Sequence, residues 1–207
     1  SEMCIRDRNK ALCIFVLSQD FKNELIRRGI KSDIHLTSTK VPDYFISGFD
    51  LSMRQGKAEN IMYSGRIEKA KGVYETVDTF SILKSQYKDL TLTFVGDGSE
   101  LPMLKQYVEN KKIKDVRFTG ELRGEDFKKE YINADMYLFL SYTEGMPTVV
   151  LEAMIFGLPI FTRKVGGLID FFENGKMGYI SSSLDPAVFA EAMKPYIENP
   201  AKMRSVS

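Results

Sequence analysis

Two carboxylates, Glu144 and Glu152, lie close to a predicted junction between a strand and a helix. An apolar run at Met136–Leu140 indicates the strand, and Pro147 stands where the first turn of a helix tolerates proline. Gly157 marks the end of that helix. Glu144 is therefore expected in the loop after the strand, whereas Glu152 is expected about one and a half turns into the helix.

The helix that carries Glu152 is otherwise apolar, and a carboxylate in such surroundings is costly unless it has hydrogen-bond partners. Sugar hydroxyls are such partners, because one carboxylate can accept from two of them and therefore suits a vicinal diol. The backbone amides of 145–148 are expected to face the same cleft. The alternative is that Glu152 faces solvent, and the spacing alone leaves both interpretations open.

Two cations lie in the loop that follows an earlier predicted strand, Ile61–Tyr63. Arg66 and Lys71 are five residues apart, and Gly65 precedes them. A guanidinium group presents a planar fork and an ammonium group a point charge, and both bind phosphate oxygens. The two could hold a diphosphate from two sides, with the positive end of the next helix adding to the site. The alternative is that both are solvated loop charges.

Two further glycine-containing loops follow predicted strands. Gly96 and Gly98 lie in Phe-Val-Gly-Asp-Gly, which lacks the full dinucleotide-binding fingerprint, so we expect these glycines to form a tight turn beside the cleft. The segment 163–167, Arg-Lys-Val-Gly-Gly, could bring backbone amides close to a phosphate or a sugar. Its alternative is a flexible turn with charged side chains. Together the loops are expected to surround one cleft.

These loops take their positions from a repeating pattern of strands and helices. Six short apolar runs lie at Ile61–Tyr63, Leu90–Val95, Asp115–Phe118, Met136–Leu140, Leu158–Thr162 and Gly178–Ile180. Most of the stretches between them have helical periodicity, as at Val73, Val77, Phe80 and Leu83. Strands that alternate with helices predict an α/β fold with a parallel sheet, and we expect a doubly wound, Rossmann-like domain. Ligands of such domains bind at the carboxyl ends of the strands.

A separate strand and helix are predicted near the start of the chain. Ala11–Leu17 has the pattern of a strand, and Ser18–Arg28 that of a helix with its first residue as N-cap and Gly29 at its end. Residues 37–59 show no periodicity and are interpreted as a connection between domains. Residues 1–8 lead into no element and are interpreted as non-native.

The composition argues against several classes of function. Of 207 residues, 43% are hydrophobic and 28% are charged, and the net charge of +1 gives no electrostatic case for binding nucleic acid. No apolar run approaches the roughly 20 residues that span a bilayer, and there is no signal-peptide pattern. Cys4 and Cys13 form no disulfide framework, and His35, the only histidine, is expected to be solvated or structural. We therefore expect no metal site and a cytoplasmic location.

The order of these motifs resembles that of one enzyme family. The matching residues are Gly65-Arg66, Lys71-Gly72, Val95–Gly98, Phe118 with Gly120, Glu144–Pro147 and Glu152–Met154. The resemblance is to the group 1, or family 4, glycosyltransferases of the GT-B fold, which has two Rossmann-like domains. It extends from Asn60 onward, with a weaker match at Ala11–Phe45, and the order and spacing of the motifs are together highly specific.

The resemblance implies a role for each matching residue. Arg66 and Lys71 would bind the diphosphate of a nucleotide-sugar donor and stabilise the leaving nucleotide diphosphate in place of a metal. Glu144, with the amides of Gly145 to Pro147, would hold the hydroxyls of the donor sugar. Glu152 would hold the ribose diol. Catalysis is thus assigned to Arg66, Lys71 and Glu144.

The resemblance also implies where the base binds and what the reaction is. Leu122 and Arg123 are candidates for contact with the base. The implied donor-binding residues are Gly65, Arg66, Lys71, Glu144, Gly145, Met146, Pro147, Thr148 and Glu152. Transfer would retain the anomeric configuration without a divalent cation or a cofactor, and the donor in this family is most often a UDP-sugar.

The chain also departs from the family. A complete member is nearly twice as long, and Met146 replaces the aromatic residue that often follows the first motif glycine. We interpret 1–8 as non-native, 9–58 as the remnant of an N-terminal domain with its connection, and 59–207 as the C-terminal nucleotide-sugar-binding domain. Donor binding is expected in this fragment. Transfer to a saccharide or lipid-linked acceptor in polysaccharide or glycolipid assembly would need the missing domain, through which the whole enzyme could also touch a membrane.

A non-catalytic module that binds nucleotide sugars or a partner is the alternative function. Such a module would be expected to have lost a motif residue, yet Arg66, Lys71, Glu144 and Glu152 are all present. A dehydrogenase-type Rossmann domain is excluded because its Gly-x-Gly-x-x-Gly turn is missing.

Overall fold

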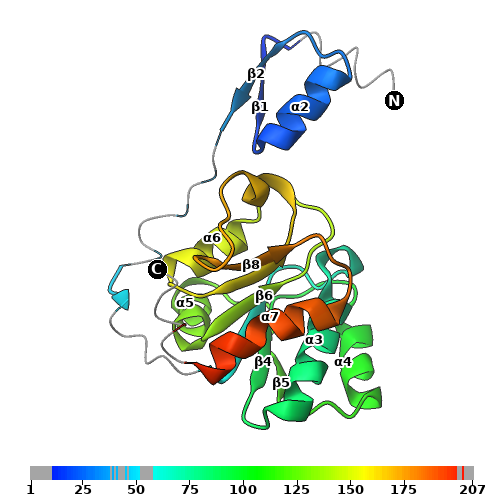
Figure 1. Ribbon diagram of the computed structural model, residues 1–207, viewed down its shortest axis with the longest axis vertical. Helices are drawn as coiled ribbons and strands as arrows, with labels where there is room; N and C mark the ends of the chain where they lie inside the picture. The colour runs from blue at the N-terminus through cyan, green and yellow to red at the C-terminus, as the bar shows by residue number, and fades with distance from the viewer. Residues whose placement is uncertain are drawn as a thin grey trace.

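The structure is a computed structural model, and it describes residues 11–37, 39, 41, 45, 47–51, 58–199 and 202 (Figure 1). These residues form a two-stranded sheet and a separate six-stranded sheet. Figure 1 shows the two-stranded unit at one end of the molecule, next to the larger sheet with its helices. The interpretation of residues 1–8 as non-native falls outside the described residues.

Six parallel strands form the larger sheet, as the repeating apolar runs predict. They are β3 (Asn60–Ser64), β4 (Thr91–Val95), β5 (Val116–Phe118), β6 (Met136–Phe139), β7 (Ile160–Arg163) and β8 (Gly178–Ser181). Their order is β5-β4-β3-β6-β7-β8, so the chain moves outward from β3 and then returns to the other side of that strand. The predicted doubly wound, Rossmann-like α/β fold is confirmed, and its topological switch point lies between β3 and β6.

Helices cover both faces of this sheet (Figure 1). They are η3 (Lys69–Lys71), α3 (Val73–Gln86), α4 (Leu101–Asn110), α5 (Gly124–Asn133), α6 (Thr148–Ile155), η4 (Gly166–Asp170) and α7 (Pro186–Glu198). α3, α4 and α7 lie on one face, where α3 contacts the other two, and α5 and α6 lie on the opposite face. Within the described ranges, no helix is both long enough and apolar enough to cross a membrane.

An apolar helix face and the central strands form the core. Val73, Val77, Phe80 and Leu83 lie on one face of α3, and all four are completely buried, as their spacing predicts. All residues of β6 are buried as well, because a parallel sheet is covered on both faces. Burying a side chain such as Phe80 stabilises the fold by about 1.5–3 kcal/mol. Packing of this kind holds the strand ends, and therefore the loops between them, in fixed positions.

The N-terminal unit consists of β1 (Cys13–Val16), α2 (Gln19–Arg27) and β2 (Asp33–Leu36), and its two strands are parallel. The predicted strand and helix are confirmed with slightly shorter bounds. Ser18 caps the helix, because its Oγ accepts a 3.1 Å hydrogen bond from a backbone amide in the first turn. The sequence does not predict β2, because only Ile34 in this strand is buried and the pattern is too short to recognise.

Candidate functional site

The loops that follow β3 and β6 are hydrogen-bonded to each other at the switch point. The carbonyl of Ala70 accepts from the amide of Tyr142 at 2.9 Å and from Oγ of Ser141 at 3.2 Å. Gly72 allows this approach, because its φ is +67° and a Cβ at this position would lie 2.0 Å from the carbonyl oxygen of Leu140. One loop carries both predicted cations and the other carries the first predicted carboxylate, so this packing brings opposite charges together.

Lys71 and Glu144 form an ion pair across these two loops. Nζ of Lys71 lies 2.7 Å from Oε1 of Glu144, and the side chains are only 15% and 13% exposed. Charges interact more strongly away from water, so this pair is more than a surface contact. The ammonium group of Lys71 has three N–H donors, and it can therefore bind a phosphate oxygen while it keeps Glu144 as a partner.

A cavity of about 350 Å³ lies at the carboxyl ends of β3 and β4. The residues that line it are Gly65, Arg66, Val95, Gly96, Asp97, Glu121, Leu122, Phe127 and Val149. Its volume is within the range that is typical of small-molecule sites. Leu122, Phe127 and Val149 provide apolar surface, and Arg66 provides a positive charge. This combination suits a flat ring that is attached to an anionic group.

Arg66 is the predicted cation that lines this cavity. Its side chain is 69% exposed, and Nη1 lies 2.9 Å from Oε1 of Glu68. An exposed ion pair contributes only about 0–1 kcal/mol, so an incoming phosphate can replace the carboxylate. The backbone here is fixed, because the carbonyl of Arg66 accepts a 2.8 Å hydrogen bond from the hydroxyl of Tyr63. The loop is thus held in place while the guanidinium group faces solvent.

Gly96 and Gly98 let two loops pack backbone against backbone, which agrees with the structural role expected for them. A Cβ on Gly96 would lie 2.0 Å from the carbonyl oxygen of Gly65, and a Cβ on Gly98 would lie 2.4 Å from that of Ile67. The amide of Ile67 also donates to the carbonyl of Asp97 at 2.8 Å. Glycine is therefore needed here to place the loop with the two cations beside the cavity.

The start of α6 presents backbone amides that have no acceptor. The amides of Gly145, Met146 and Thr148 make no hydrogen bond within the described part of the chain. Pro147 has no N–H, so it can contribute only its ring and carbonyl to a site. The carbonyl of Gly145 is occupied, because it accepts a 2.8 Å hydrogen bond from the amide of Gly167. Open amides at a helix N-terminus favour an anion or a hydroxyl oxygen.

Glu152 is half-buried and lies beside the cavity wall. Its Oε2 accepts a 2.8 Å hydrogen bond from the hydroxyl of Tyr131, and the same hydroxyl lies 3.3 Å from the carbonyl of Val149, which lines the cavity. Burial raises the pKa of Glu152 above its usual value, and the hydrogen bond from Tyr131 opposes this rise. The alternative in which Glu152 simply faces solvent does not agree with these contacts.

Sequence reasoning missed three buried hydroxyl groups behind Glu152. Oγ of Ser64 lies 2.8 Å from the hydroxyls of both Tyr131 and Tyr137, and all three residues are completely buried. A signal was present, because a tyrosine in a buried strand or helix needs a hydrogen-bond partner. The partners themselves could not be identified from the sequence, since they come from β3, α5 and β6.

The two candidates for contact with the base lie in different surroundings. Leu122 lines the cavity. The side chain of Arg123 is 85% exposed, does not line the cavity, and forms a 2.7 Å ion pair with Glu121. The structure therefore places Leu122, but not Arg123, with the other cavity residues.

The segment 163–167 supports the site from behind. Arg163 is only 3% exposed, and it donates from Nε to the carbonyl of Ser183 at 3.2 Å and from Nη2 to that of Leu184 at 3.3 Å. Its guanidinium group also lies 4.2 Å from the centre of the Tyr142 ring. Arg163 is therefore a buried structural residue, and the alternative of a flexible turn with charged side chains does not describe this side chain.

The N-terminal unit contacts the same region. The amide of Gln19, at the start of α2, donates to Oδ2 of Asp170 at 2.8 Å. Leu17 lies close to two glycines of the site loops: a Cβ on Gly167 would lie 2.4 Å from its carbonyl oxygen, and a Cβ on Gly145 would lie 3.5 Å from its Cδ1. The end of β1 therefore lies next to the loops after β6 and β7.

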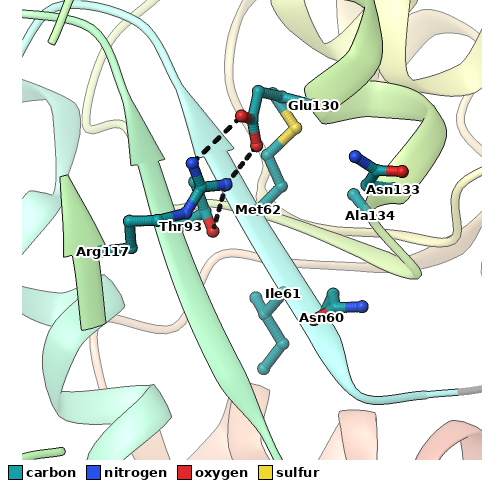
Figure 2. Close-up of a pocket in the computed structure, with 8 residues that line it drawn as sticks. All are labelled: Asn60, Ile61, Met62, Thr93, Arg117, Glu130, Asn133 and Ala134. Carbon is teal, nitrogen blue, oxygen red and sulfur yellow. Dashed lines mark hydrogen bonds and ion pairs between the residues drawn. The ribbon is translucent and has the colours of Figure 1, made fainter. Parts of the chain in front are cut away.

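A second, smaller pocket of about 80 Å³ lies near the amino end of β3 (Figure 2). Figure 2 shows Arg117 beside Glu130, with Nη1 of Arg117 at 3.1 Å from Oε1 of Glu130 and Nη2 at 3.3 Å from Oγ1 of Thr93. The charged groups in this pocket, Arg117 and Glu130, form an ion pair with each other. It is also at the opposite end of the strand from the switch-point loops, so we do not assign the candidate site to it.

No cluster of three or more His, Cys, Asp or Glu side chains is arranged to hold a metal ion in the described part of the structure. His35 is exposed, and its ring centre lies 5.7 Å from that of Phe15. This position agrees with a solvated or structural histidine.

Comparison with known proteins identifies related sequences. A family model described as glycosyl transferases group 1 matches residues 52–207. Glycogen synthase from Mycobacterium tuberculosis is 30% identical over 149 residues, which cover 72% of this chain and 36% of that protein. The capsular polysaccharide biosynthesis glycosyltransferase CapM from Staphylococcus aureus is 30% identical over 147 residues, or 67% of this chain and 37% of that protein. The chain thus spans little more than a third of the length of these relatives.

Solved structures share the fold. HepE from Anabaena, crystallised with UDP and glucose, superposes with a TM-score of 0.80 at 19% identity, over 100% of this chain and 60% of that chain. The C-terminal domain of LpcC, a glycosyl transferase group 1 family protein from Francisella tularensis, has a TM-score of 0.69 at 20% identity, over 80% of this chain and 92% of that chain. The six-stranded sheet with its helices therefore matches the C-terminal domain of GT-B glycosyltransferases.

Proposed function

Because the chain belongs to the group 1 glycosyl transferases, we propose that residues 59–207 are the donor-binding domain of a retaining, family 4 enzyme. Residues 9–58 are then the remnant of the N-terminal domain with its connection. The observation that carries the proposal is the ion pair of Lys71 and Glu144 beside a cavity that Arg66 lines. The pair lies at the switch point of a doubly wound sheet, which is where such folds bind ligands.

The diphosphate of the donor is assigned to Arg66 and Lys71. Arg66 is exposed and only weakly paired, so its guanidinium fork is available to two phosphate oxygens. Lys71 is held by Glu144 at 2.7 Å and offers its remaining N–H groups. As the bond between the anomeric carbon and the diphosphate breaks, negative charge grows on the leaving oxygen. The two cations stabilise that charge, and no divalent cation is needed in this role.

The hydroxyl groups of the donor are assigned to the two carboxylates. Glu144, together with the open amides of Gly145, Met146 and Thr148, holds the sugar. Glu152 holds the ribose diol, because it lies beside the cavity wall with one carboxylate oxygen already bonded to Tyr131. These assignments place the sugar near the ion pair and the nucleoside toward the cavity.

The base is assigned to the cavity itself. Leu122 and Phe127 supply apolar surface for a planar ring. Among the two residues that the family resemblance suggests, Leu122 is the better candidate, because Arg123 does not line the cavity.

The remaining parts of the reaction belong to the whole enzyme. CapM is named for capsular polysaccharide biosynthesis, and HepE was crystallised with UDP and glucose. By analogy we assign to this protein a UDP-sugar donor and a saccharide or lipid-linked acceptor in polysaccharide or glycolipid assembly. A cytoplasmic enzyme that contacts a membrane from its surface fits this role. The acceptor is bound by the N-terminal domain, so this part of the enzyme is expected to bind donor without completing transfer.

A thermal-shift screen tests donor binding directly. The chain is mixed with uridine, guanosine and adenosine diphosphates and with their sugar conjugates. A ligand at a hundred times its Kd stabilises the fold by about 2.7 kcal/mol, which is easily measured as a rise in Tm. A shift with one nucleotide series would identify the base. A cooperatively folded protein that responds to none of these ligands would contradict the proposal.

Two variants separate the roles of the carboxylates. Glu152→Ala should weaken binding of the nucleotide and of its sugar conjugate alike, by about 1–3 kcal/mol, because a diol loses its acceptor. Glu144→Ala should weaken binding of the sugar conjugate and leave the bare nucleotide almost unaffected. Equal effects of both variants on both ligands would rule out this division of roles.

A further inference from the structure

The hydroxyl groups behind Glu152 form a continuous chain that ends at its carboxylate. The hydroxyl of Tyr137 lies 2.8 Å from Oγ of Ser64, which lies 2.8 Å from the hydroxyl of Tyr131. The hydroxyl of Tyr131 lies 2.8 Å from Oε2 of Glu152. These groups come from β6, β3, α5 and α6, so they connect four elements that meet under the cavity.

The direction of the hydrogen bonds follows from counting protons. An ionised Glu152 can only accept, and burial raises the pKa of Tyr131 well above its usual value, so Tyr131 keeps its proton and donates it to the carboxylate. Ser64 is then free to donate to Tyr131. The hydroxyl of Tyr137 has two acceptors on Ser64, Oγ at 2.8 Å and the backbone carbonyl at 3.2 Å. The hydroxyls of Ser64 and Tyr131 thus both donate toward Glu152, and hydrogen bonds aligned in this way strengthen one another.

We propose that Tyr131 is a positioning residue for the nucleotide site: its hydroxyl, oriented by Ser64 and Tyr137, holds the carboxylate of Glu152 ready for the ribose diol. This inference rests on the proposed function, which makes Glu152 the ribose ligand. Tyr131 occupies Oε2, while Oε1 of Glu152 has no hydrogen-bond partner among the described residues and can accept from a ligand. Tyr131 is completely buried and is not expected to touch the nucleotide itself.

Few other groups act on the charge of Glu152. Among the residues that the structure describes, the titratable groups that face it are the phenols of Tyr131 on α5 and Tyr137 on β6. The charged residue of β7, Arg163, is engaged with the carbonyls that follow β8, and the buried Lys128 of α5 donates to the carbonyl of Ser47. No salt bridge reaches Glu152 in the described part of the chain. The hydrogen bond from Tyr131 is therefore the main interaction that favours the ionised carboxylate.

The variant Tyr131→Phe removes this hydrogen bond and keeps the ring. The pKa of Glu152, followed by the side-chain carboxyl carbon in NMR titrations, should rise relative to the wild type. The hydrogen bond favours the ionised form, so without it protonation occurs at higher pH. Ser64→Ala should raise the pKa of Glu152 by a smaller amount. In this variant Tyr131 loses the hydrogen bond that it accepts from Ser64 but keeps the one that it donates to Glu152. This titration needs no ligand, so it tests the inference even if the nucleotide is not yet known.

Binding of uridine diphosphate supplies the second readout. The comparison is made at a pH above the pKa of Glu152 in both the wild type and Tyr131→Phe. There, Tyr131→Phe should weaken binding about 3- to 10-fold, which corresponds to the net free energy of one hydrogen bond to a charged group. The acid side of the binding profile should move to higher pH. The weakening should disappear when 2′,3′-dideoxyuridine diphosphate is the ligand, because that ligand has no diol to place.

Tyr196→Phe is the matched control. Tyr196 is also a buried tyrosine, on α7, and its hydroxyl makes no hydrogen bond among the described residues. It should leave both the Glu152 titration and the binding profile unchanged. A Tyr131→Phe protein that unfolds at lower temperature but titrates and binds like the wild type would overturn the inference and leave a purely structural role. If Tyr131→Phe loses binding of uridine diphosphate while Glu152→Gln binds it as the wild type does, the assignment of the ribose to Glu152 is wrong.

Discussion

Nζ of Lys71 and Oε1 of Glu144 lie 2.7 Å apart, although 73 residues separate them in the chain. The distance is set by backbone contacts, since Gly72 packs against Leu140 and Ala70 accepts hydrogen bonds from the following loop. The ion pair is therefore built by the loops at the switch point. The two side chains are close because the loops that carry them are in direct backbone contact.

Disrupting one partner of this pair should destabilise the protein. Lys71→Met leaves Glu144 without its cation in a poorly exposed place, and we expect a loss near the low end of about 3–5 kcal/mol. The double variant Lys71→Met with Glu144→Gln should be more stable than the sum of the single changes, because no uncompensated charge remains. Urea unfolding of the four proteins measures this coupling.

A neighbouring lysine provides the control for that cycle. Lys69 lies in the same short helix as Lys71, but its side chain is 77% exposed and 4.0 Å from Glu100. Lys69→Met should change the free energy of unfolding by no more than about 0.5 kcal/mol. Additive effects of the changes at Lys71 and Glu144, within about 0.5 kcal/mol, would show that the pair contributes no coupling.

Gly72 should tolerate no side chain. In Gly72→Ala the new Cβ would lie 2.0 Å from a backbone oxygen, so the loops must separate. We expect a loss of about 1–3 kcal/mol from this overlap, together with loss of nucleotide binding. Gly175→Ala is the matched control, because Gly175 also has a positive φ, +84°, but no atom within 4 Å of the added Cβ. Equal loss of stability in the two variants would assign the effect to the backbone conformation alone.

Much of the fold could be predicted from the sequence, because its signals are local. The helix face with Val73 and Phe80 and the buried strand Met136–Phe139 have periods that identify each element without its neighbours. The alternation of strands and helices then predicts a parallel sheet. β2 was not predictable, because a four-residue strand with one buried side chain has no clear period.

The candidate site was only partly predictable, because its contacts join distant parts of the chain. Arg66 and Lys71 could be recognised as phosphate-binding residues by type, yet only the fold shows that Lys71 bonds Glu144 while Arg66 lines the cavity. The hydrogen bond from Tyr131 to Glu152 likewise depends on how α5 crosses the sheet. Side-chain type predicts the chemistry that a residue can perform, whereas tertiary packing decides its partner.

The buried carboxylate of Glu152 should make the folded protein less stable at neutral pH. Burial raises its pKa in the folded protein, so folding favours the protonated form. The protonated form of Glu152 therefore contributes to the free energy of unfolding. This contribution is fully present below the pKa that Glu152 has in the unfolded chain, and it is lost as pH rises through its pKa in the folded protein. Glu152→Gln should therefore gain stability relative to the wild type as pH rises from below the pKa of an unfolded glutamate to above the raised pKa of Glu152 in the folded protein, while nucleotide binding weakens. Chemical unfolding across this range measures the difference, and a pH-independent difference would contradict the assignment.

Leu122 and Arg123 should differ in their effect on nucleotide binding. Leu122→Ala removes apolar surface from the cavity, and we expect binding to weaken by about 1 kcal/mol, or roughly 5-fold. Arg123→Ala should have little effect, because this side chain is exposed and paired with Glu121 outside the cavity lining. Isothermal titration with the nucleotide found in the screen compares the two. A larger effect of Arg123→Ala would mean that this side chain turns toward the base when the ligand binds.

Asp170 should hold the N-terminal unit against the site loops. Its carboxylate accepts a hydrogen bond from the first amide of α2 at 2.8 Å, where a helix has unsatisfied donors and a partial positive charge. Asp170→Ala should therefore speed hydrogen exchange in the first turn of α2, corresponding to a local loss of about 0.5–2 kcal/mol, while the amides of β6 exchange as before. Asp20→Ala is the control, because Asp20 lies in the same turn but makes no hydrogen bond among the described residues. Unchanged exchange in α2 of Asp170→Ala would mean that Leu17 and its apolar contacts, rather than this carboxylate, keep the two parts together.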